Sequence, residues 1–363
     1  MKLTLAFDEF NKELEDLKQY IQVNIIEYQD KISEFHQVEL IDTKAIEMQD
    51  FFRGKYRKTR TLAKIINYSA VIILLYAYFE KFLENTARYY LEDLCKCCET
   101  YDRLPEKIQK NHLEKSIDLI KNINLDKYRS LTEQEILENL YHCQCENKNT
   151  INFYAYMQHR GNFRSSTILD FFADIGINNI NGKIANLDDF KTYIKVKTPE
   201  LGIFLESKNK DFNHLYSRIN DLVSKRNDIA HGMPTSQILS FEIIIDDYID
   251  FIQNYSKSLQ EVLYNQVLFY EIKYCLLSLG KPIKVWNNEI IGIEVHNIKI
   301  SVGDRIIGKK ADGNCKSGTI ISIQVNGESK NSIEVEDDSV QVGLKVNFFI
   351  KENYEIFISQ IKS

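Results

Sequence analysis

The spacing of apolar residues changes once along the 363-residue chain, near Gly280-Lys281-Pro282. Before this point, apolar residues recur at steps of three and four, which is the period of amphipathic helices. After it, short β-rich runs alternate with turn signals, among them the hairpin dipeptides Asn326-Gly327 and Asp312-Gly313. The pattern therefore predicts a mainly α protein, a helical bundle followed by a small C-terminal β-barrel.

The same spacing predicts the individual elements. Helices are expected at about 7–35, 66–94, 105–122, 132–145, 163–176, 212–231 and 240–275, and the pattern at 177–210 is undecided. Strands are expected at 290–295, 304–307, 319–325, 342–350 and 354–358. We divide the chain into an N-terminal helical extension at 1–60, a helical domain at 61–279 and a small β-barrel domain at 280–363.

The longest apolar run, Ile65–Phe79, is interrupted by Asn67, Ser69 and three tyrosines. It is shorter than the roughly 20 apolar residues that span a bilayer, so we expect a buried core helix and no membrane. The N-terminus turns charged within a few residues and lacks the apolar segment of a signal peptide. An odd number of cysteines, seven, fits reduced thiols, and we expect a cytoplasmic location.

Two features outside the apolar pattern could bind a ligand. The net charge of −6 excludes a uniformly basic nucleic-acid binder. The dense basic run around Tyr56 could still bind RNA, although a solvated helix face explains it as well; its cations are Lys55, Arg57, Lys58 and Arg60. Sulfur-rich segments could supply zinc ligands, but their spacing fits no known zinc site, so we expect structural thiols and neither metal nor cofactor; they contain Cys95, Cys97, Cys98, Cys143 and Cys145.

One constellation breaks the helical pattern at 212–231. Arg226 falls on the apolar stripe of this helix, where a buried guanidinium costs several kcal/mol unless anions or carbonyls surround it. Asn227 and His231 follow at i and i+4 on one face, and Gly232 ends the helix. An arginine fork binds phosphate and an imidazole transfers protons near neutral pH, so these groups suit RNA cleavage by the 2′-hydroxyl. The alternative is structural: an arginine paired with a core carboxylate and a histidine that closes a helix.

The string Leu222–Gly232, LVSKRNDIAHG, resembles the signature of the HEPN superfamily and is most similar to the bacterial RiboL-PSP-HEPN type. A tyrosine- and glutamate-bearing helix at 71–84 and the segment Gly161-Asn162-Phe163 precede it, as in that type. The resemblance covers roughly residues 60–265. It implies an antiparallel helical bundle in which Arg226 and His231 are catalytic and Asn227 is the polar residue after the arginine.

The resemblance also implies a function. Such domains are similar to metal-independent ribonucleases of toxin–antitoxin and abortive-infection systems, and they pair so that two motifs form one cleft. We therefore expect an RNA-cleaving homodimer that acts as a toxin or antiviral effector, with an antitoxin or other regulatory partner. The alternatives are a non-catalytic HEPN interaction module, such as a scaffold or antitoxin-like subunit, and a target of a nucleotidyltransferase.

Glu80 and the glycine-containing segment 302–346 give two further expectations. Glu80 shares a stripe with Ile66, Ile73 and Ala77, and could orient Arg226 from across the bundle or lie at the surface. The glycine pattern of 302–346 resembles the second-domain β-barrel of translation elongation factors, which contacts tRNA or the ribosome. This resemblance implies that the barrel recruits a substrate or a partner.

Overall fold

The computed structural model describes residues 2–27, 43–206, 212–232, 238–311, 313–336 and 338–359, without the side chains of 27, 43–45, 49, 52–61, 204, 206 and 212–213. Two compact units make up the chain. The first comprises Met1–Asp93 and Thr100–Val262, and the second comprises Leu94–Glu99 and Leu263–Ser363. The second unit thus begins before the expected boundary at Gly280, because it includes the end of a long helix as well as the strands.

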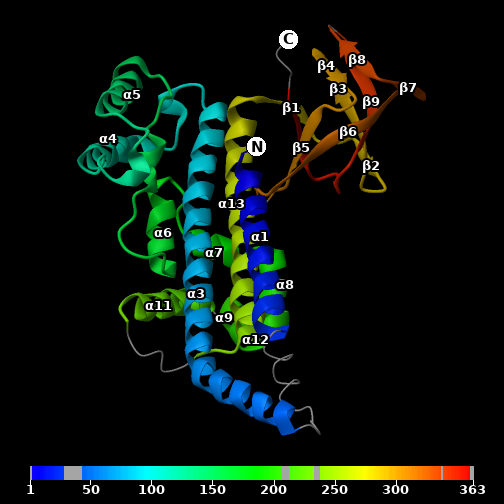
Figure 1. The fold of residues 1–363 in the computed structure, drawn as a ribbon. Helices are drawn as coiled ribbons and strands as arrows, with labels where there is room; N and C mark the ends of the chain where they lie inside the picture. The colour runs from blue at the N-terminus through cyan, green and yellow to red at the C-terminus, as the bar shows by residue number, and fades with distance from the viewer. Residues whose placement is uncertain are drawn as a thin grey trace. The chain divides into compact units, whose positions relative to one another are not determined.

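The first unit is helical, as predicted (Figure 1). Its helices include α1 (Leu3–Tyr20), the π-helix η1 (Ile21–Glu27), α3 (Thr43–Cys97), α4 (Glu106–Lys121), α5 (Glu133–Glu146), α6 (Ser165–Asp174), α7 (Ile180–Ala185), α8 (Asp188–Lys197), α9 (Pro199–Glu206), α10 (Phe212–Leu215), α11 (Ser217–Ala230), α12 (Phe241–Ile243), the π-helix η5 (Ile244–Ile249) and α13 (Asp250–Tyr274). The part of the undecided segment that the structure describes, 177–206, contains the helices α7 to α9.

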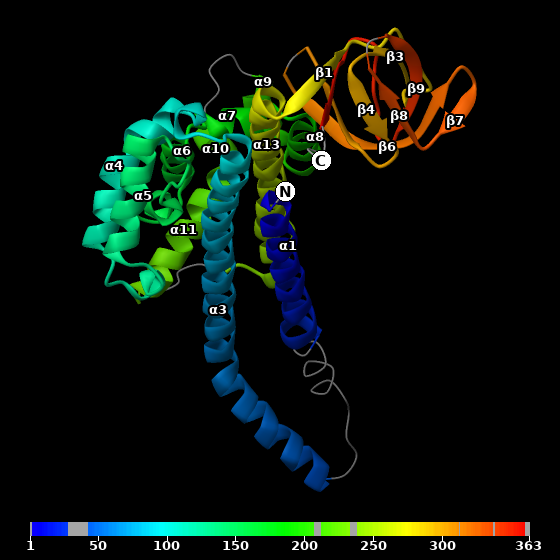
Figure 2. The same cartoon turned by 90° about the horizontal axis from the view of Figure 1, so that it is seen from above.

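The long helix α3 is the centre of this unit. Helices α4, α5 and α6 lie on one side of it, and α1 and α13 lie on the other (Figures 1 and 2). Among the described residues, one helical stretch, Leu62–Cys97, is long and apolar enough to span a membrane by length and composition alone. Its buried side chains follow the three-and-four spacing of a core helix, as predicted for this run: Tyr68, Val71, Ile72, Leu75, Tyr76, Phe79, Phe82 and Leu83.

The N-terminal helix α1 is part of this core, although we expected residues 1–60 to form an extension. Phe10 is 1% exposed and stacks on Phe82 with the ring centroids 4.5 Å apart. The buried carboxylate of Asp93 accepts a hydrogen bond of 3.0 Å from the Leu3 N–H at the start of α1, where the helix leaves donors unpaired. The predicted helix at 7–35 is shorter than expected, since α1 ends at Tyr20 and η1 at Glu27.

Two other predicted helices are interrupted. The one at 212–231 divides at Tyr216, whose buried hydroxyl donates a 2.6 Å hydrogen bond to the Asn181 carbonyl. The one at 240–275 begins with α12 and η5 before α13. The helix at 163–176 ends as predicted at Gly176, whose φ of +87° is a left-handed conformation that favours glycine.

The second unit contains the predicted antiparallel strands as a half-barrel. The sheet order is β1-β10-β5-β6-β9-β3-β2, with β7 on β6 and with β4 paired to β8. The strands are β1 (Leu276–Gly280), β2 (Lys284–Trp286), β3 (Ile290–Val295), β4 (Ile298–Ser301), β5 (Arg305–Lys309), β6 (Cys315–Val325), β7 (Glu328–Lys330), β8 (Ser332–Val335), β9 (Val340–Val346) and β10 (Glu355–Ser359). Asn326 and Gly327 turn between β6 and β7 with positive φ, as a hairpin turn of this kind requires. The expected turn residue Asp312 lies outside the described residues.

A buried histidine on α4 predicts a pH-dependent stability. His112 is fully buried and accepts a 3.0 Å hydrogen bond from the Asn152 N–H at Nε2, and burial lowers its pKa to about 4. The folded state therefore favours the neutral imidazole, whereas the unfolded chain protonates near pH 6.5. The contribution of the neutral His112 imidazole to the free energy of unfolding is fully present above pH 6.5. About 3 kcal/mol of it is lost as the pH falls from 6.5 to 4.

Chemical denaturation at several pH values tests this prediction. His112→Gln should reduce the loss in the free energy of unfolding between pH 6.5 and 4, whatever its effect at neutral pH. His296→Gln, at an exposed position of the second unit, is the control for a histidine substitution that removes no buried group. Equal slopes in the parent and in His112→Gln would contradict the assignment.

Candidate active site

Helix α11 brings the predicted Arg–Asn–His motif to its C-terminal end. Its buried face, with Ile219, Leu222 and Val223, packs into the bundle. The His231 N–H donates to the Asn227 carbonyl at 2.9 Å, which places these two residues one turn apart, as the i, i+4 spacing predicts. His231 is the C-cap, and the next residue, Gly232, has a φ of +66°. The imidazole is consequently exposed where the helix ends.

The Arg226 guanidinium is half-buried and has no carboxylate partner among the described residues. Its Cζ lies 5.3 Å from the centroid of the Tyr76 ring, and its Nη1 donates a 3.2 Å hydrogen bond to Asn227 Oδ1. An arginine has five N–H donors, so this single bond leaves most of its fork available. The arrangement holds a cation in place without neutralising it, which suits an anionic ligand such as a phosphate.

Asn227 is held from the opposite side by a second asparagine. Asn162 Nδ2 donates to Asn227 Oδ1 at 2.6 Å, so that oxygen accepts from both Asn162 and Arg226. Asn162 Oδ1 is in turn 3.4 Å from the Tyr76 hydroxyl, which accepts a 3.1 Å bond from the Phe163 N–H. The segment Gly161-Asn162-Phe163 therefore joins α3 to α11 and fixes the orientation of the Asn227 amide.

Tyr76 and Glu80 lie one turn apart on α3, and their side chains are within hydrogen-bonding distance. The Tyr76 hydroxyl is 3.2 Å from Glu80 Oε1 and can donate its single proton either there or to Asn162. Burial raises the pKa of Tyr76 well above its usual value, so this hydroxyl remains neutral at physiological pH. Of the two alternatives for Glu80, a direct ion pair with Arg226 is absent among the described residues. Ile66 and Ile73, which lie on the same stripe of α3 as Glu80, are exposed. The Glu80 carboxylate is linked to Arg226 indirectly, because both contact Tyr76.

His159 extends this network in a way that the sequence did not predict. Its Nε2 lies 3.3 Å from Glu84 and 3.6 Å from Glu80, and its Nδ1 lies 2.7 Å from the Gly161 carbonyl. Both ring nitrogens thus face acceptors, which favours the doubly protonated ring. Burial opposes that charge, but Glu84, Gly161 and Glu80 together hold the pKa of His159 above its usual value. Tyr76, Glu80 and Glu84 follow an i, i+4, i+8 spacing, the one sequence signal that could have suggested this cluster.

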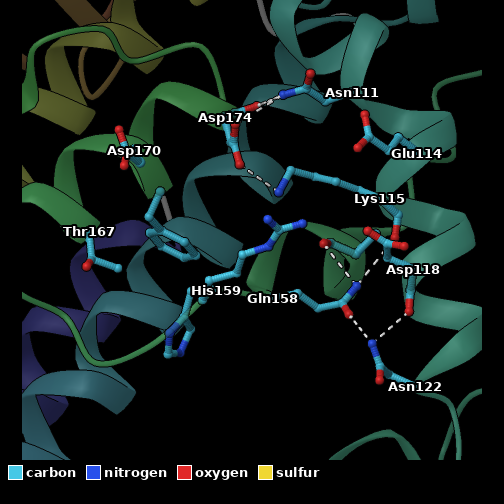
Figure 3. Close-up of a pocket in the computed structure, with 13 residues that line it drawn as sticks. Asn111, Glu114, Lys115, Asp118, Asn122, Gln158, His159, Thr167, Asp170 and Asp174 are labelled. Carbon is cyan, nitrogen blue, oxygen red and sulfur yellow. Dashed lines mark hydrogen bonds and ion pairs between the residues drawn. The ribbon is translucent and has the colours of Figure 1, made fainter.

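A polar cavity of about 590 Å³ lies beside His159, lined by residues of α4 and α6 and by the segment at 155–160. Figure 3 shows Lys115 reaching Asp174, an ion pair of 2.7 Å, and Asn111 bonded to the same aspartate. Arg226 and His231 do not line this cavity. The cavity is therefore separate from the Arg–His motif.

The remaining sequence candidates have separate outcomes. The backbone of the basic run belongs to α3, but its side chains lie outside the described residues: Lys55, Arg57, Lys58 and Arg60. Cys97, Cys98 and Cys143 are buried, and no disulfide joins the cysteines in the part of the chain that the structure describes. Within the described ranges, no group of three or more His, Cys, Asp or Glu side chains is placed to hold a metal ion.

Comparison with known proteins identifies the family of the first unit. The RiboL-PSP-HEPN family model matches residues 11–265, whereas no curated protein matches the chain. The match begins within α1 and not near residue 60, where we expected it, in keeping with the packing of Phe10 on Phe82. It includes every residue of the network from Tyr76 to His231 and ends before the first strand. The chain therefore belongs to the RiboL-PSP-HEPN family of HEPN domains, which are commonly ribonucleases of defence and toxin systems.

Proposed function

We propose that this protein is a metal-independent endoribonuclease in which Arg226 and His231 are catalytic. The observation that carries the proposal is the Arg226 guanidinium, which is anchored by Tyr76 and Asn227 yet unpaired with any carboxylate among the described residues. If Arg226 were purely structural, a buried carboxylate should pair with its guanidinium. Glu80, the candidate for that role, contacts Tyr76 instead. An anchored, unneutralised arginine beside an exposed histidine is the arrangement that phosphate chemistry requires.

The proposed reaction uses the substrate's own nucleophile. His231 takes the proton of a ribose 2′-hydroxyl, whose oxygen then attacks the adjacent phosphorus. The bond from phosphorus to the 5′-oxygen breaks, and that oxygen leaves with a proton from a general acid. Arg226 stabilises the added negative charge on the phosphoryl oxygens in the transition state. The products are a 2′,3′-cyclic phosphate and a 5′-hydroxyl, and no metal is needed to generate the nucleophile.

Homodimer formation is part of the proposal, because the motif of one chain supplies one imidazole. A reaction that removes one proton and delivers another is helped by two groups, an acid and a base. A two-fold pairing of identical chains would bring a second Arg226–His231 motif to the same cleft. We further propose a cytoplasmic toxin or antiviral effector, controlled by an antitoxin or another regulatory partner, since that is the setting of this family.

Cleavage in the presence of EDTA tests the chemistry. Purified protein should cut a single-stranded RNA with excess EDTA at a rate close to that without it. The fragments should carry 2′,3′-cyclic phosphates, detected by mass spectrometry as a loss of water relative to the linear phosphate. An RNA with 2′-O-methyl groups is the matched control and should resist cleavage. Products with 5′-phosphates would rule out this mechanism, and absence of any cleavage would favour a non-catalytic interaction module.

A further inference from the structure

The second unit carries an exposed aromatic ring that its own core does not use. Trp286 on β2 is the only tryptophan of the chain and is 45% exposed. Its ring lies against Gly292 on the neighbouring strand, where a methyl group would come within 2.8 Å of the ring atom Cζ3. The glycine therefore lets one part of the ring rest on the sheet while the rest of it is open to solvent.

Lysines flank this ring on the same face of the sheet. Lys284 is paired with Gly292, Trp286 with Ile290, and Ile290 with Lys345. Directly paired residues of antiparallel strands project to the same face, so Lys284, Trp286 and Lys345 share the outer face of the half-barrel. The ammonium group of Lys284 lies 5.6 Å from the ring centroid of Trp286. A positive charge is thus within reach of any flat group that contacts the ring.

A second exposed ring with lysines lies on the adjoining segment. Phe349 is also 45% exposed, and the ammonium groups of Lys316 and Lys351 are 5.2 and 5.7 Å from its ring centroid. This segment is bonded to the turn that follows Trp286, since the Ile350 N–H donates to the Asn288 carbonyl at 2.9 Å. We call the six residues Lys284, Trp286, Lys316, Lys345, Phe349 and Lys351 the aromatic–lysine surface.

The charge of this surface differs from that of the half-barrel sequence as a whole. Residues 280–363 contain eleven basic and eleven acidic residues, so the average charge predicts nothing. The aromatic–lysine surface gathers four lysines against two nearby carboxylates, so positive charge is in excess. Glu289 lies 4.0 Å from Lys345, and Glu352 accepts a 3.3 Å hydrogen bond from the Val285 N–H. The surface is therefore locally cationic around two open rings.

We propose that the aromatic–lysine surface binds single-stranded RNA, with bases stacked on Trp286 and Phe349 and phosphates near the lysines. Rings that accept any base face, combined with cations that follow a backbone, are the two requirements for binding single strands without sequence preference. A polypeptide with only acidic side chains would use the lysines but has no aromatic groups to stack on the rings. The inference rests on the proposed function in that RNA is the substrate, and it assigns RNA capture to the half-barrel.

Intrinsic fluorescence of the full chain gives a direct readout, because every tryptophan signal comes from Trp286. The probe is a 2′-O-methylated oligouridylate of about 12 nucleotides, a length within the range that single-strand binding modules cover. It cannot be cut through the 2′-oxygen, so binding is measured apart from catalysis. Saturation with this probe should quench the fluorescence of Trp286, and the quench should weaken as salt rises.

Two substitutions at one position separate stacking from general hydrophobic contact. Trp286→Leu keeps an apolar side chain and should weaken binding of the labelled probe about tenfold, measured by fluorescence anisotropy. Trp286→Phe keeps a ring and should bind close to the parent. The double change Lys316→Ala and Lys351→Ala should lower the slope of log affinity against log salt by about 1.4, roughly 0.7 for each lost charge. Circular dichroism checks that each variant is folded.

Three results would overturn the proposal: an unchanged Trp286 signal at saturation, equal affinities of Trp286→Leu and Trp286→Phe, or an equal quench by polyglutamate. The last would identify an acidic polypeptide as the partner. If Trp286→Leu fails to fold, the titration of the parent chain still decides. Failure of the proposed nuclease is recognised separately, since it leaves natural RNA uncut while the quench by the methylated probe persists.

Discussion

Replacing Arg226 by alanine is expected to lower the rate of RNA cleavage by about 10²- to 10³-fold, the cost of removing a donor aimed at developing charge. The guanidinium is held by the Tyr76 ring and by Asn227, and it contacts no carboxylate among the described residues. Its loss therefore removes charge stabilisation without leaving a buried anion unpaired. Arg226→Lys should rescue little, because an ammonium lacks the planar fork that binds two phosphoryl oxygens.

Arg218→Ala is the matched control on the same helix. Arg218 has its own carboxylate partner, Asp247, at 3.1 Å, and it precedes the motif by two turns. This variant should cleave RNA at nearly the parental rate, whereas His231→Ala should be as defective as Arg226→Ala. Single-turnover assays with protein in excess measure the chemical step directly. Full activity in Arg226→Ala would show that the active site is not at the end of α11.

The activity per chain is also expected to fall steeply when the protein is diluted. If one cleft needs His231 from two chains, only the dimer cleaves. Well below the dissociation constant, the dimer fraction is proportional to total protein, so a hundredfold dilution lowers activity per chain about a hundredfold. Sedimentation velocity over the same concentrations should show the dimer disappear in parallel.

A mixing experiment controls for adsorption and unfolding at low concentration. Adding excess His231→Ala chains to dilute parent protein should titrate the parent into mixed dimers that have a single His231 imidazole at the cleft. Activity should fall further, whereas adding an unrelated carrier protein should change nothing. Activity per chain that stays constant at all concentrations, or indifference to the variant chains, would show that one motif is sufficient.

The sequence located the Arg–Asn–His motif because all three residues belong to one helix, where spacing alone determines the face. It missed His159, because this residue joins Glu80 and Glu84 from a segment about 75 positions away. A side chain in an irregular segment has no period from which its neighbours can be inferred. The sequence leaves two interpretations of Glu80 open, because an apolar stripe does not show which side of α3 other helices cover. Ile66 and Ile73 on this stripe are exposed.

The fold class followed from the change of period at Gly280, but the limits of the parts did not. An amphipathic pattern in α1 predicted a helix without stating what would cover its apolar face, and Phe82 on α3 does so. The shortest strands, such as β2 with three residues and β4 with four, contain too few positions for alternation to be recognised. Strand pairing supplies the regularity that their sequences lack.

Helix α13 begins in the first unit, and its last turns, from Leu263, belong to the second. Leu268 is fully buried with Ile307 and Phe357 of the half-barrel, and the Tyr264 hydroxyl lies 2.6 Å from Ser317 Oγ. For protein engineering, the chain thus offers no linker at Gly280 at which to cut. A minimal HEPN domain should instead end near residue 265, where the family match ends, or carry polar replacements at Leu268 and its neighbours. Grafting the half-barrel onto another protein likewise requires that this stretch of helix travel with it.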